Sequence, residues 1–450
     1  MFNIALKSLS KTASKRTKAR LAFLKSCSKR TTIIQRPIAN PFASHGHANP
    51  AELGNAELFS RKGSWGQCSV LFPDMATDIA AYKSGKAPYG GAEYGITLTP
   101  EADAICQKMA ALHGGVGAIL CPSGLSAITT TIAAFAPQTI LFPRNVYYPM
   151  LRFLEHRKLH AFSYPNGASA DEVAALVKQA LAIPYAPENI MIYIEAPGSG
   201  TFEIPDIDGI VALAKKKGIR TVMDNAWASH VRYKPLEHGI DVVIQATTKY
   251  EGGYGDTPSG VVIAGNAADY KILYEELKVS GNGAIAPTTC ARLSARIDST
   301  KQRMNEQYAT ALQLAKWFLK QPFVEAVLSP ALKTSPYYAR FKKYFGKGNG
   351  LFSVIFKENI PSEKINAFID ALNLFWIAAS WGGHVSLVLP VPRREPSSLP
   401  PGKIVRFHAG LEDPRDLLRD VQQAAQKVFT EEQKPKKPRH AKSKASKRRR

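Results

Sequence analysis

The chain has 450 residues, which is long enough for two domains and a large core, and its formal net charge is +23. The charge is concentrated at the ends, because residues 1–51 and 434–450 each hold ten lysines or arginines and no acid. The rest of the chain is close to neutral, which argues against a basic nucleic-acid-binding surface on the fold.

Residues 1–50 form a basic extension that is rich in serine and threonine, with leucines and phenylalanines interspersed. Two interpretations stay open. The extension is disordered and the protein is cytoplasmic, or residues 1–35 are a presequence for mitochondria or plastids. The segment lacks the long apolar core of a secretory signal. We expect residues 51–100 to form an N-terminal arm that precedes the first domain.

The five cysteines are scattered along the chain and form no Cys-x-x-Cys pair. This pattern indicates a reducing compartment and argues against a disulfide framework or a metal site. Residues 114–143 carry no charge, but prolines, a glycine and a threonine run interrupt them. A buried strand, turn and helix is therefore favoured over a membrane span.

From residue 116 onward, apolar strands alternate with amphipathic helices. Strands are predicted at 116–120, 139–142 and 190–195, with two more ending at Asp224 and near Lys249, and helices at 125–135, 170–181 and 207–217. This alternation predicts an α/β fold with a mostly parallel central sheet covered on both faces. We assign residues 101–295 to this domain.

The pattern changes after residue 296. A long helix is predicted over 299–320 and a strand over 351–356, which indicates a smaller C-terminal α+β domain at 296–430. Residues 431–450 are almost entirely basic and polar, and we expect a disordered tail that keeps the protein soluble. The alternative is weak, salt-sensitive binding of this tail to RNA, DNA or anionic lipid.

Two charged residues follow β-branched runs in the first domain. Asp224 ends Thr221-Val222-Met223, and Lys249 follows the run that starts at Asp241. The carboxyl ends of neighbouring parallel strands meet in one crevice. An amine that can form a Schiff base, facing a carboxylate that can keep a pyridine nitrogen protonated, is what pyridoxal 5'-phosphate (PLP) needs from a protein.

Further residues suit the same cofactor. Pro122-Ser123-Gly124-Leu125 opens a helix directly after a strand, so its backbone N–H groups can bind the PLP phosphate. Thr247 and Thr248 could add hydroxyl donors, although threonine pairs are also common in strands. Tyr147 could stack on the cofactor ring, with Tyr148 as the rival, and either could serve packing alone.

The second domain supplies a candidate substrate clamp. Arg406 interrupts an apolar strand, and a guanidinium can bind a substrate carboxylate through two hydrogen bonds, although a structural ion pair is the alternative. The turn Ser380-Trp381-Gly382-Gly383 has small residues that leave room for a ligand.

Several short runs together resemble the trans-sulfuration family of fold-type I PLP-dependent enzymes, and within it the cystathionine β-lyases. The likeness covers roughly residues 60–430. The runs that carry it are Glu195-Ala-Pro-Gly-Ser199, Asp224-Asn-Ala-Trp-Ala228, Lys234-Pro-Leu-Glu-His-Gly-Ile-Asp241, Gln245-Ala-Thr-Thr-Lys-Tyr250, Ser380-Trp-Gly-Gly383 and Val405-Arg-Phe-His-Ala-Gly-Leu-Glu-Asp413.

The resemblance implies a homotetramer built from dimers, in which the arm of one subunit completes the site of its neighbour. By position, Lys249 matches the Schiff-base lysine, Asp224 the pyridinium partner and Tyr147 the stacking tyrosine. Gly124 and Leu125 match the phosphate-binding amides, with Thr248 as a hydroxyl contact. Ser380 and Arg406 match the pair that binds the substrate carboxylate, beside Trp381.

This chain departs from the family pattern in the arm, after the lysine and at Ala226, where the family has a threonine after Asp-Asn. The arm of the family carries a Tyr-x-Arg motif, whereas Tyr94 is matched here without an arginine. After the lysine, the usual Gly-His-Ser-Asp is Gly253-Tyr254-Gly255-Asp256. The first departure implies weaker cofactor binding or another cation in place of the arginine, and the second leaves substrate choice open.

The resemblance implies a carbon–sulfur lyase of methionine biosynthesis. In this reaction Lys249 removes the Cα proton, with Tyr147 and Tyr94 as further catalytic residues, and cystathionine yields homocysteine, pyruvate and ammonia. The alternatives are a γ-lyase, a γ-synthase or a cysteine desulfhydrase on the same fold. A degenerate PLP fold with a binding role, in which the basic tails carry the interaction, is the rival from another functional class.

Overall fold

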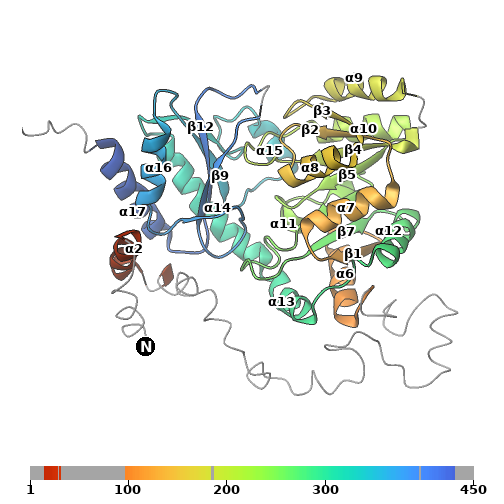
Figure 1. The fold of residues 1–450 in the computed structure, drawn as a ribbon, viewed down its shortest axis with the longest axis horizontal. Helices are drawn as coiled ribbons and strands as arrows, with labels where there is room; N and C mark the ends of the chain where they lie inside the picture. Colours follow the sequence, from red (N-terminus) through yellow and green to blue (C-terminus); the bar gives the residue numbers. More distant parts are fainter. Residues whose placement is uncertain (1–14, 29, 32–96, 184–186, 395–396, 431–450) are drawn as a thin grey trace, which may run out of the picture.

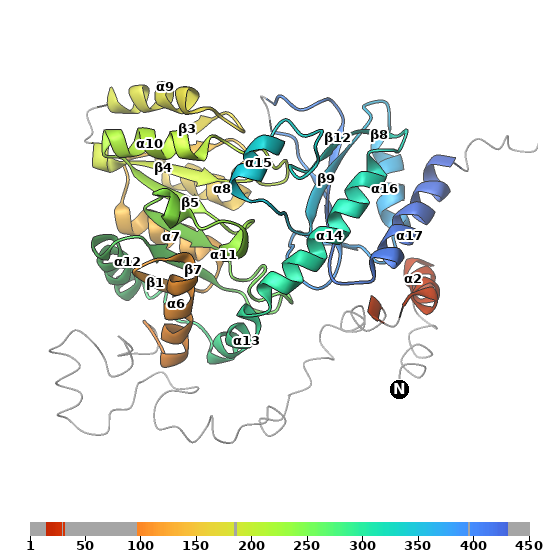
Figure 2. The same cartoon turned by 180° about the vertical axis from the view of Figure 1, so that it is seen from behind.

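A computed structural model describes residues 15–28, 30–31, 97–183, 187–394 and 397–430. Two lobes lie side by side, a larger α/β lobe and a smaller lobe built on a second sheet (Figure 1). The view from behind shows one long helix, α14 (Thr300–Phe318), running from the junction of the lobes into the smaller one (Figure 2).

The large lobe contains a seven-stranded sheet in the order β1-β7-β6-β5-β4-β2-β3. The five strands from β6 to β3 are parallel to their neighbours, and β7 is antiparallel to both β1 and β6. The strands are β1 (Gly117–Cys121), β2 (Thr139–Pro143), β3 (His160–Tyr164), β4 (Ile190–Glu195), β5 (Arg220–Asp224), β6 (Val242–Gln245) and β7 (Gly260–Ala264). The predicted mostly parallel sheet is confirmed.

Helices cover both faces of this sheet because side chains along each buried strand alternate between two apolar cores. Ile119 of β1 and Ile244 of β6 face the core formed with α7, α8 and α12, whereas Leu120 and Val243 face the core formed with α6 and α13. The helices of this lobe are α6 (Pro100–His113), α7 (Gly124–Phe135), α8 (Tyr148–Arg157), α9 (Ala170–Leu181), α10 (Ile207–Lys217), α11 (Ser229–Arg232), α12 (Ala267–Ser280) and α13 (Pro287–Ile297).

The small lobe has a five-stranded sheet in the order β10-β11-β12-β9-β8, antiparallel except between β10 and β11. Its core is rich in phenylalanine, and Phe318 of α14 lies 5.0 Å from Phe407 between ring centroids. After α14, the elements are β8 (Val324–Leu328), α15 (Tyr338–Tyr344), β9 (Leu351–Phe356), α16 (Ser362–Ala371), β10 (Trp376–Ile377), β11 (Leu387–Val391), β12 (Lys403–His408) and α17 (Pro414–Ala425).

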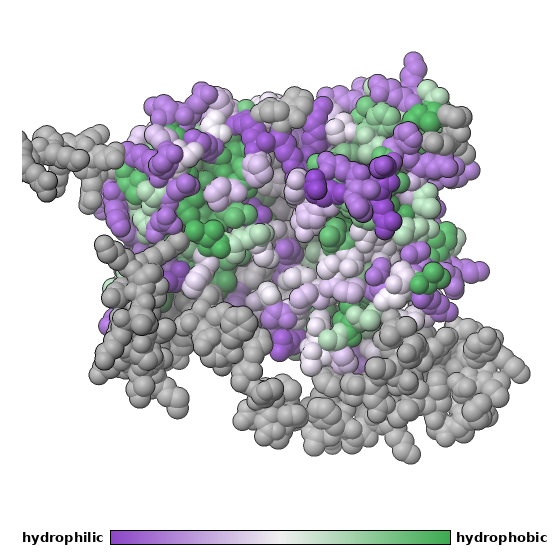
Figure 3. Space-filling view, viewed as in Figure 1, coloured by the Kyte–Doolittle hydropathy of each residue, from purple (hydrophilic) through white to green (hydrophobic). Residues whose placement is uncertain are grey.

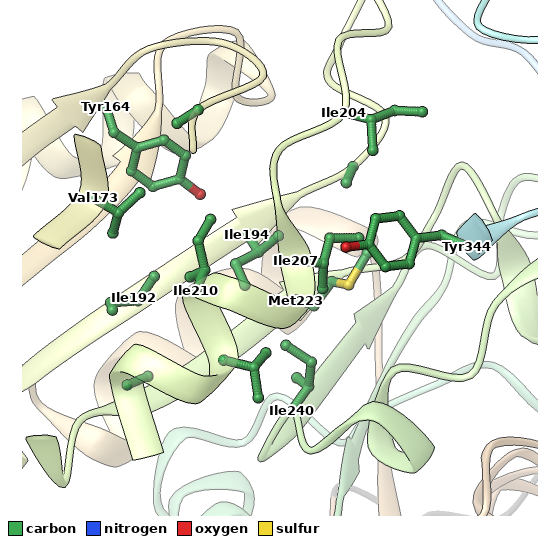
Figure 4. Close-up of a cluster of buried hydrophobic side chains, with 14 of the residues drawn as sticks. Tyr164, Val173, Ile192, Ile194, Ile204, Ile207, Ile210, Met223, Ile240 and Tyr344 are labelled. Atoms are coloured by element: carbon green, nitrogen blue, oxygen red, sulfur yellow. The ribbon is translucent and has the colours of Figure 1, made fainter. Parts of the chain in front are cut away.

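The two lobes share a core as well as a linker. Figure 4 shows Tyr344 of α15 beside Ile207 and Met223 of the large lobe. The Tyr344 hydroxyl also donates to a carboxylate oxygen of Asp206 at 3.3 Å, just before α10 begins. These contacts fix the small lobe against the large one, so side chains from both can hold a common site.

Part of the predicted basic extension is folded. Residues 15–26 form helix α2, which lies against the small lobe near α17 in both ribbon views (Figures 1 and 2). Leu24 is buried in the core of that lobe, and the Arg20 guanidinium lies 3.5 Å from the centre of the Trp376 ring. The fully buried Thr31 accepts a hydrogen bond from the Asp413 N–H at 2.8 Å. The expected disorder therefore does not extend to this segment, because its few apolar and hydroxyl groups find partners on the small lobe.

Figure 3 shows hydrophilic residues spread over both lobes, with smaller hydrophobic patches on each lobe. Across the described ranges, the helices are too short or too polar to cross a bilayer.

Candidate active site

A cavity of about 330 Å³ lies where the carboxyl ends of the parallel strands face the small lobe. Open α/β sheets bind ligands at this edge. Of the residues predicted from sequence, Gly124, Leu125, Tyr147, Asp224, Thr248, Lys249, Trp381 and Arg406 line the cavity. Tyr94 lies outside the described residues. The fold thus brings together lining residues that lie as far apart in the sequence as positions 123 and 406.

Lys249 lies in a turn after β6 rather than at the end of the strand. The strand stops at Gln245, and the Lys249 N–H donates to the Ala246 carbonyl at 3.0 Å. The Lys249 amine donates to the Ser380 hydroxyl at 3.0 Å and lies 5.0 Å from the centre of the Trp381 ring. Burial and the nearby Arg406 cation lower the pKa of Lys249 to about 8, against the attraction of Asp224.

Asp224 is the last residue of β5, next to β6 in the sheet, and its side chain is almost fully buried. Its carboxylate accepts the Ala226 N–H at 2.9 Å and the Tyr193 hydroxyl at 3.4 Å. Burial raises the pKa of Asp224, while these donors and the Lys249 amine oppose the rise. Asp224 and Lys249 attract each other without forming a direct ion pair, and both line the cavity.

The first turn of α7 provides an anion site. Ser123 caps the helix by accepting the Ser126 N–H at 2.9 Å, and the N–H groups of Gly124 and Leu125 have no partner within the helix. A Cβ atom at Gly124 would lie 2.7 Å from the Cβ atom of Ala246, so glycine is required where α7 passes the turn that leads to Lys249.

The two threonines before Lys249 differ in orientation. Thr248 lines the cavity, and its hydroxyl exchanges hydrogen bonds with the Ser259 backbone at 2.9 Å. Thr247 is fully buried and donates to the Ser259 hydroxyl at 2.8 Å, and it is absent from the cavity lining. Thr248 can therefore contact a ligand in the cavity, whereas the Thr247 hydroxyl is hydrogen-bonded within the protein interior.

The two candidate stacking tyrosines are also distinguished. Tyr147 precedes α8 and lines the cavity with 40% of its surface exposed. Tyr148 is absent from the lining, and its ring lies 5.5 Å from the Arg394 guanidinium. Tyr147 is thus the tyrosine in reach of a ligand in this cavity.

The small lobe contributes Arg406 from β12 and the turn after β10. The Arg406 guanidinium donates to the carbonyls of Ala379 at 3.2 Å and Ser380 at 3.1 Å. Burial lowers its pKa to about 10, and in the described ranges no carboxylate forms an ion pair with it. Gly382 has φ +81°, and a Cβ atom there would lie 2.9 Å from the Lys249 carbonyl carbon, so the turn packs directly on the lysine.

Sequence reasoning did not assign a role to Glu195 or Ser199, although both line the cavity. Glu195 ends β4 beside Asp224, and the Ser199 hydroxyl donates to it at 2.5 Å. Trp227 also lines the cavity. The position of Glu195 at the end of a buried strand is the signal that could have identified it, because the same signal identified Asp224.

These residues fit PLP. The free helix N–H groups at Gly124 and Leu125 suit a phosphate, the deprotonatable Lys249 suits an aldehyde, and the buried Asp224 suits a protonated ring nitrogen. Lys249 and Asp224 both line the cavity, so one bound cofactor can contact both.

Comparisons with known proteins agree with this geometry. Residues 72–426 match the profile of the family described as Cys/Met metabolism PLP-dependent enzyme. The chain is 34% identical to an L-alanine/L-glutamate racemase of Wolbachia pipientis wMel, over 79% of this chain and 90% of the relative. It is 31% identical to the cystathionine beta-lyase of Escherichia coli K12, over 70% of this chain and 81% of the relative.

Among solved structures, a cystathionine gamma synthase from Xanthomonas oryzae pv. oryzae matches with a TM-score of 0.66 and 23% identity, over 75% of this chain and 88% of that one. This likeness supports the fold. With the profile match over most of its length, the chain belongs to the Cys/Met metabolism family of PLP-dependent enzymes.

Proposed function

We propose that this protein is a carbon–sulfur lyase that converts cystathionine and water to homocysteine, pyruvate and ammonia by β-elimination. The observation that carries the proposal is the position of Lys249, an amine of lowered pKa that shares one cavity with Asp224 and Arg406. A base, a ring-nitrogen partner and a carboxylate clamp are what elimination from an amino acid requires.

Arg406 binds the α-carboxylate of the substrate in this proposal. Its guanidinium is held by the carbonyls of Ala379 and Ser380 and has no carboxylate partner in the described ranges. A half-buried, unpaired guanidinium gains most from a carboxylate that offers two acceptors. The clamp therefore fixes Cα relative to the large lobe.

Lys249 removes the Cα proton. Its pKa of about 8 leaves a usable neutral fraction near physiological pH, and the Ser380 hydroxyl at 3.0 Å orients the amine. When bound, PLP supplies an electron-poor ring that stabilises the electron pair left at Cα, and Asp224 keeps the ring nitrogen protonated. The bond from Cβ to sulfur then breaks, and homocysteine leaves as a thiol when its sulfur takes up the proton that Lys249 removed from Cα.

The β-lyase assignment is supported by the Pro-Gly-Ser and Ser-Trp-Gly-Gly runs and by the identity to a bacterial β-lyase. The same proton removal also begins racemisation, the activity of the Wolbachia relative, which is 34% identical to this chain against 31% for the Escherichia coli β-lyase. A racemase returns the proton to Cα, whereas a lyase loses the thiol, so products separate the two reactions.

The test incubates the purified holoenzyme with cystathionine and measures pyruvate, free thiol and 2-oxobutyrate, and with L-alanine and L-glutamate it measures the D-isomers. Pyruvate and thiol in equal amounts support the proposal, whereas 2-oxobutyrate indicates γ-chemistry and a D-isomer without pyruvate indicates racemisation. Lys249→Ala removes the base, and Lys234→Ala, which changes an exposed lysine paired with Glu237, is the matched control.

We also propose the homotetramer in which a partner's arm covers the cavity next to the exposed face of Tyr147. Light scattering coupled to size-exclusion chromatography tests it, and a monomer with full activity contradicts it. We keep a cytoplasmic location as part of the proposal, because removal of residues 1–35 as a presequence would also remove the buried contacts of α2.

A further inference from the structure

Glu195 is a buried acid of the cavity that the proposed reaction does not use. It is the last residue of β4, with 8% of its surface exposed, and it lies directly beside Asp224 in the parallel register of β4 and β5. Two carboxyl groups therefore lie side by side in one cavity. Burying two acids is costly unless hydrogen bonds or cations stabilise them, so their partners are informative.

Each oxygen of Glu195 has a partner on a different cavity segment. The backbone N–H of Tyr147 donates to Oε2 at 2.6 Å, and the Ser199 hydroxyl donates to Oε1 at 2.5 Å. Tyr147 and Ser199 both line the cavity, and the Ser199 N–H also donates to the Asn145 carbonyl at 3.0 Å. The carboxyl thus ties two loops together at the point where the Tyr147 ring enters the site.

We propose that Glu195 is a positioning residue, which fixes the main chain of Tyr147 over the cavity and leaves the single negative charge of the acid pair on Asp224. Only the effect of Glu195 on the reaction rests on the proposed function. The effect of Glu195 on stability and on the position of Tyr147 follows from its contacts.

Several charged or titratable groups surround this carboxyl. Asp224 faces it from β5, Tyr147 from the start of α8, Tyr164 from β3 and Tyr193 from β4 itself. Arg394, from the loop after β11, is the nearby cation, and its guanidinium donates to the carbonyls of Arg144 at 3.0 Å and Val146 at 2.6 Å.

Burial and the neighbouring Asp224 raise the pKa of Glu195, whereas its donors and Arg394 oppose the rise. A second negative charge beside Asp224 is costly at this depth. Glu195 therefore keeps its proton to higher pH than an ordinary carboxyl, and it can then donate to Ser199 while Asp224 alone carries the charge that a ring nitrogen needs.

The sign of the pH effect follows from linkage. An acid with a raised pKa binds its proton more tightly in the folded than in the unfolded protein, so stability is lost as pH rises above the ordinary carboxyl range. Glu195→Gln removes this loss and keeps an acceptor for the Tyr147 N–H. Glu195→Ala removes the acceptor as well and leaves a buried N–H without a partner, which is costly.

The experiment compares wild type, Glu195→Gln, Glu195→Ala and the exposed control Glu325→Gln as full-length protein. Urea unfolding is measured at about pH 5 and about pH 8, on either side of the expected loss, and the PLP dissociation constant is measured at the higher pH. We expect Glu195→Gln to gain stability relative to wild type at the higher pH only. We expect Glu195→Ala to be less stable than Glu195→Gln at both and to bind PLP about 10-fold more weakly than Glu195→Gln, because Tyr147 loses its anchor.

Equal losses in Glu195→Gln at both pH values would mean that the charge has no role, and unchanged PLP binding in Glu195→Ala would mean that the Tyr147 segment needs no anchor. Either result overturns the proposal. Neither measurement uses substrate, so a protein that shows the expected pattern but releases no pyruvate refutes the lyase and leaves the role of Glu195 standing.

Discussion

The reactivity of Lys249 depends on the cation beside it, and Arg406→Met tests this dependence. Burial and Arg406 together lower the pKa of the amine from 10.5 to about 8. At 1.36 kcal/mol for each pKa unit, this change corresponds to about 3 kcal/mol in favour of the neutral amine. At pH 7, about 9% of the amine is then neutral, against about 0.03% for an ordinary lysine, a ratio of about 300-fold.

Only the neutral amine attacks an aldehyde, so the rate of covalent attachment of PLP should rise with pH and level off above about 8. Removing the Arg406 cation raises the pKa of Lys249 and moves this plateau to higher pH. At pH 7, attachment should slow several-fold but by less than the limit of about 300-fold, because burial still acts.

The assay mixes apoprotein with PLP in a stopped-flow spectrometer across a pH series and contains no amino-acid substrate, so loss of the substrate clamp does not interfere. Borohydride reduction and mass spectrometry then locate the attachment site. Arg152→Met, which removes an exposed arginine paired with Glu155 on α8, is the control. A plateau that does not move in Arg406→Met, or attachment to another lysine, refutes the reasoning.

Three further changes probe other parts of the site and the fold. Asp224→Asn removes the charge that holds a ring nitrogen protonated, so activity should fall by about 100-fold or more while the unfolding midpoint stays equal or rises, since burial of that charge is costly. Arg406→Lys replaces a two-donor fork by a point charge and should raise KM by about 10-fold or more with a smaller change in kcat, which steady-state kinetics measures. Deletion of residues 1–31 removes Leu24 from the core of the small lobe and the Thr31 contact with Asp413, and should cost about 2–4 kcal/mol in urea unfolding.

Local patterns predicted the parallel part of the large lobe closely. The strand 190–195 and the helix 207–217 have the predicted bounds, because each has clear periodicity and an abrupt change of composition at its ends. The antiparallel β7 was not predicted. It is a fully apolar run, and only its long-range pairing with β1 and β6 determines its place and direction.

The part of the site that could be predicted from local pattern alone is the set of residues at or just after the ends of buried strands. Asp224 and Lys249 follow from the rule that ligands bind at the carboxyl edge of a parallel sheet. Arg406 was proposed as a clamp because it interrupts an apolar strand, with a structural ion pair as the alternative, whereas the role of Ser380 depended on a resemblance. No local pattern says which loop of a second lobe will face that edge. The different orientations of Thr247 and Thr248 could not be predicted either, because both lie in a turn whose geometry depends on contacts with Ser259.

Composition misjudged residues 15–31 for a physical reason. A segment with many basic residues is expected to stay unfolded because repulsion exceeds what its few apolar groups gain. In α2, however, the Arg20 cation lies over the Trp376 ring. After α2, the Ser28 N–H donates to the Asp416 carboxylate, and the Thr31 hydroxyl accepts the Asp413 N–H. The Arg30 cation also pairs with Glu306 of α14, 276 residues further along the chain. A charge count along the sequence cannot detect this compensation, because it becomes local only in the folded protein.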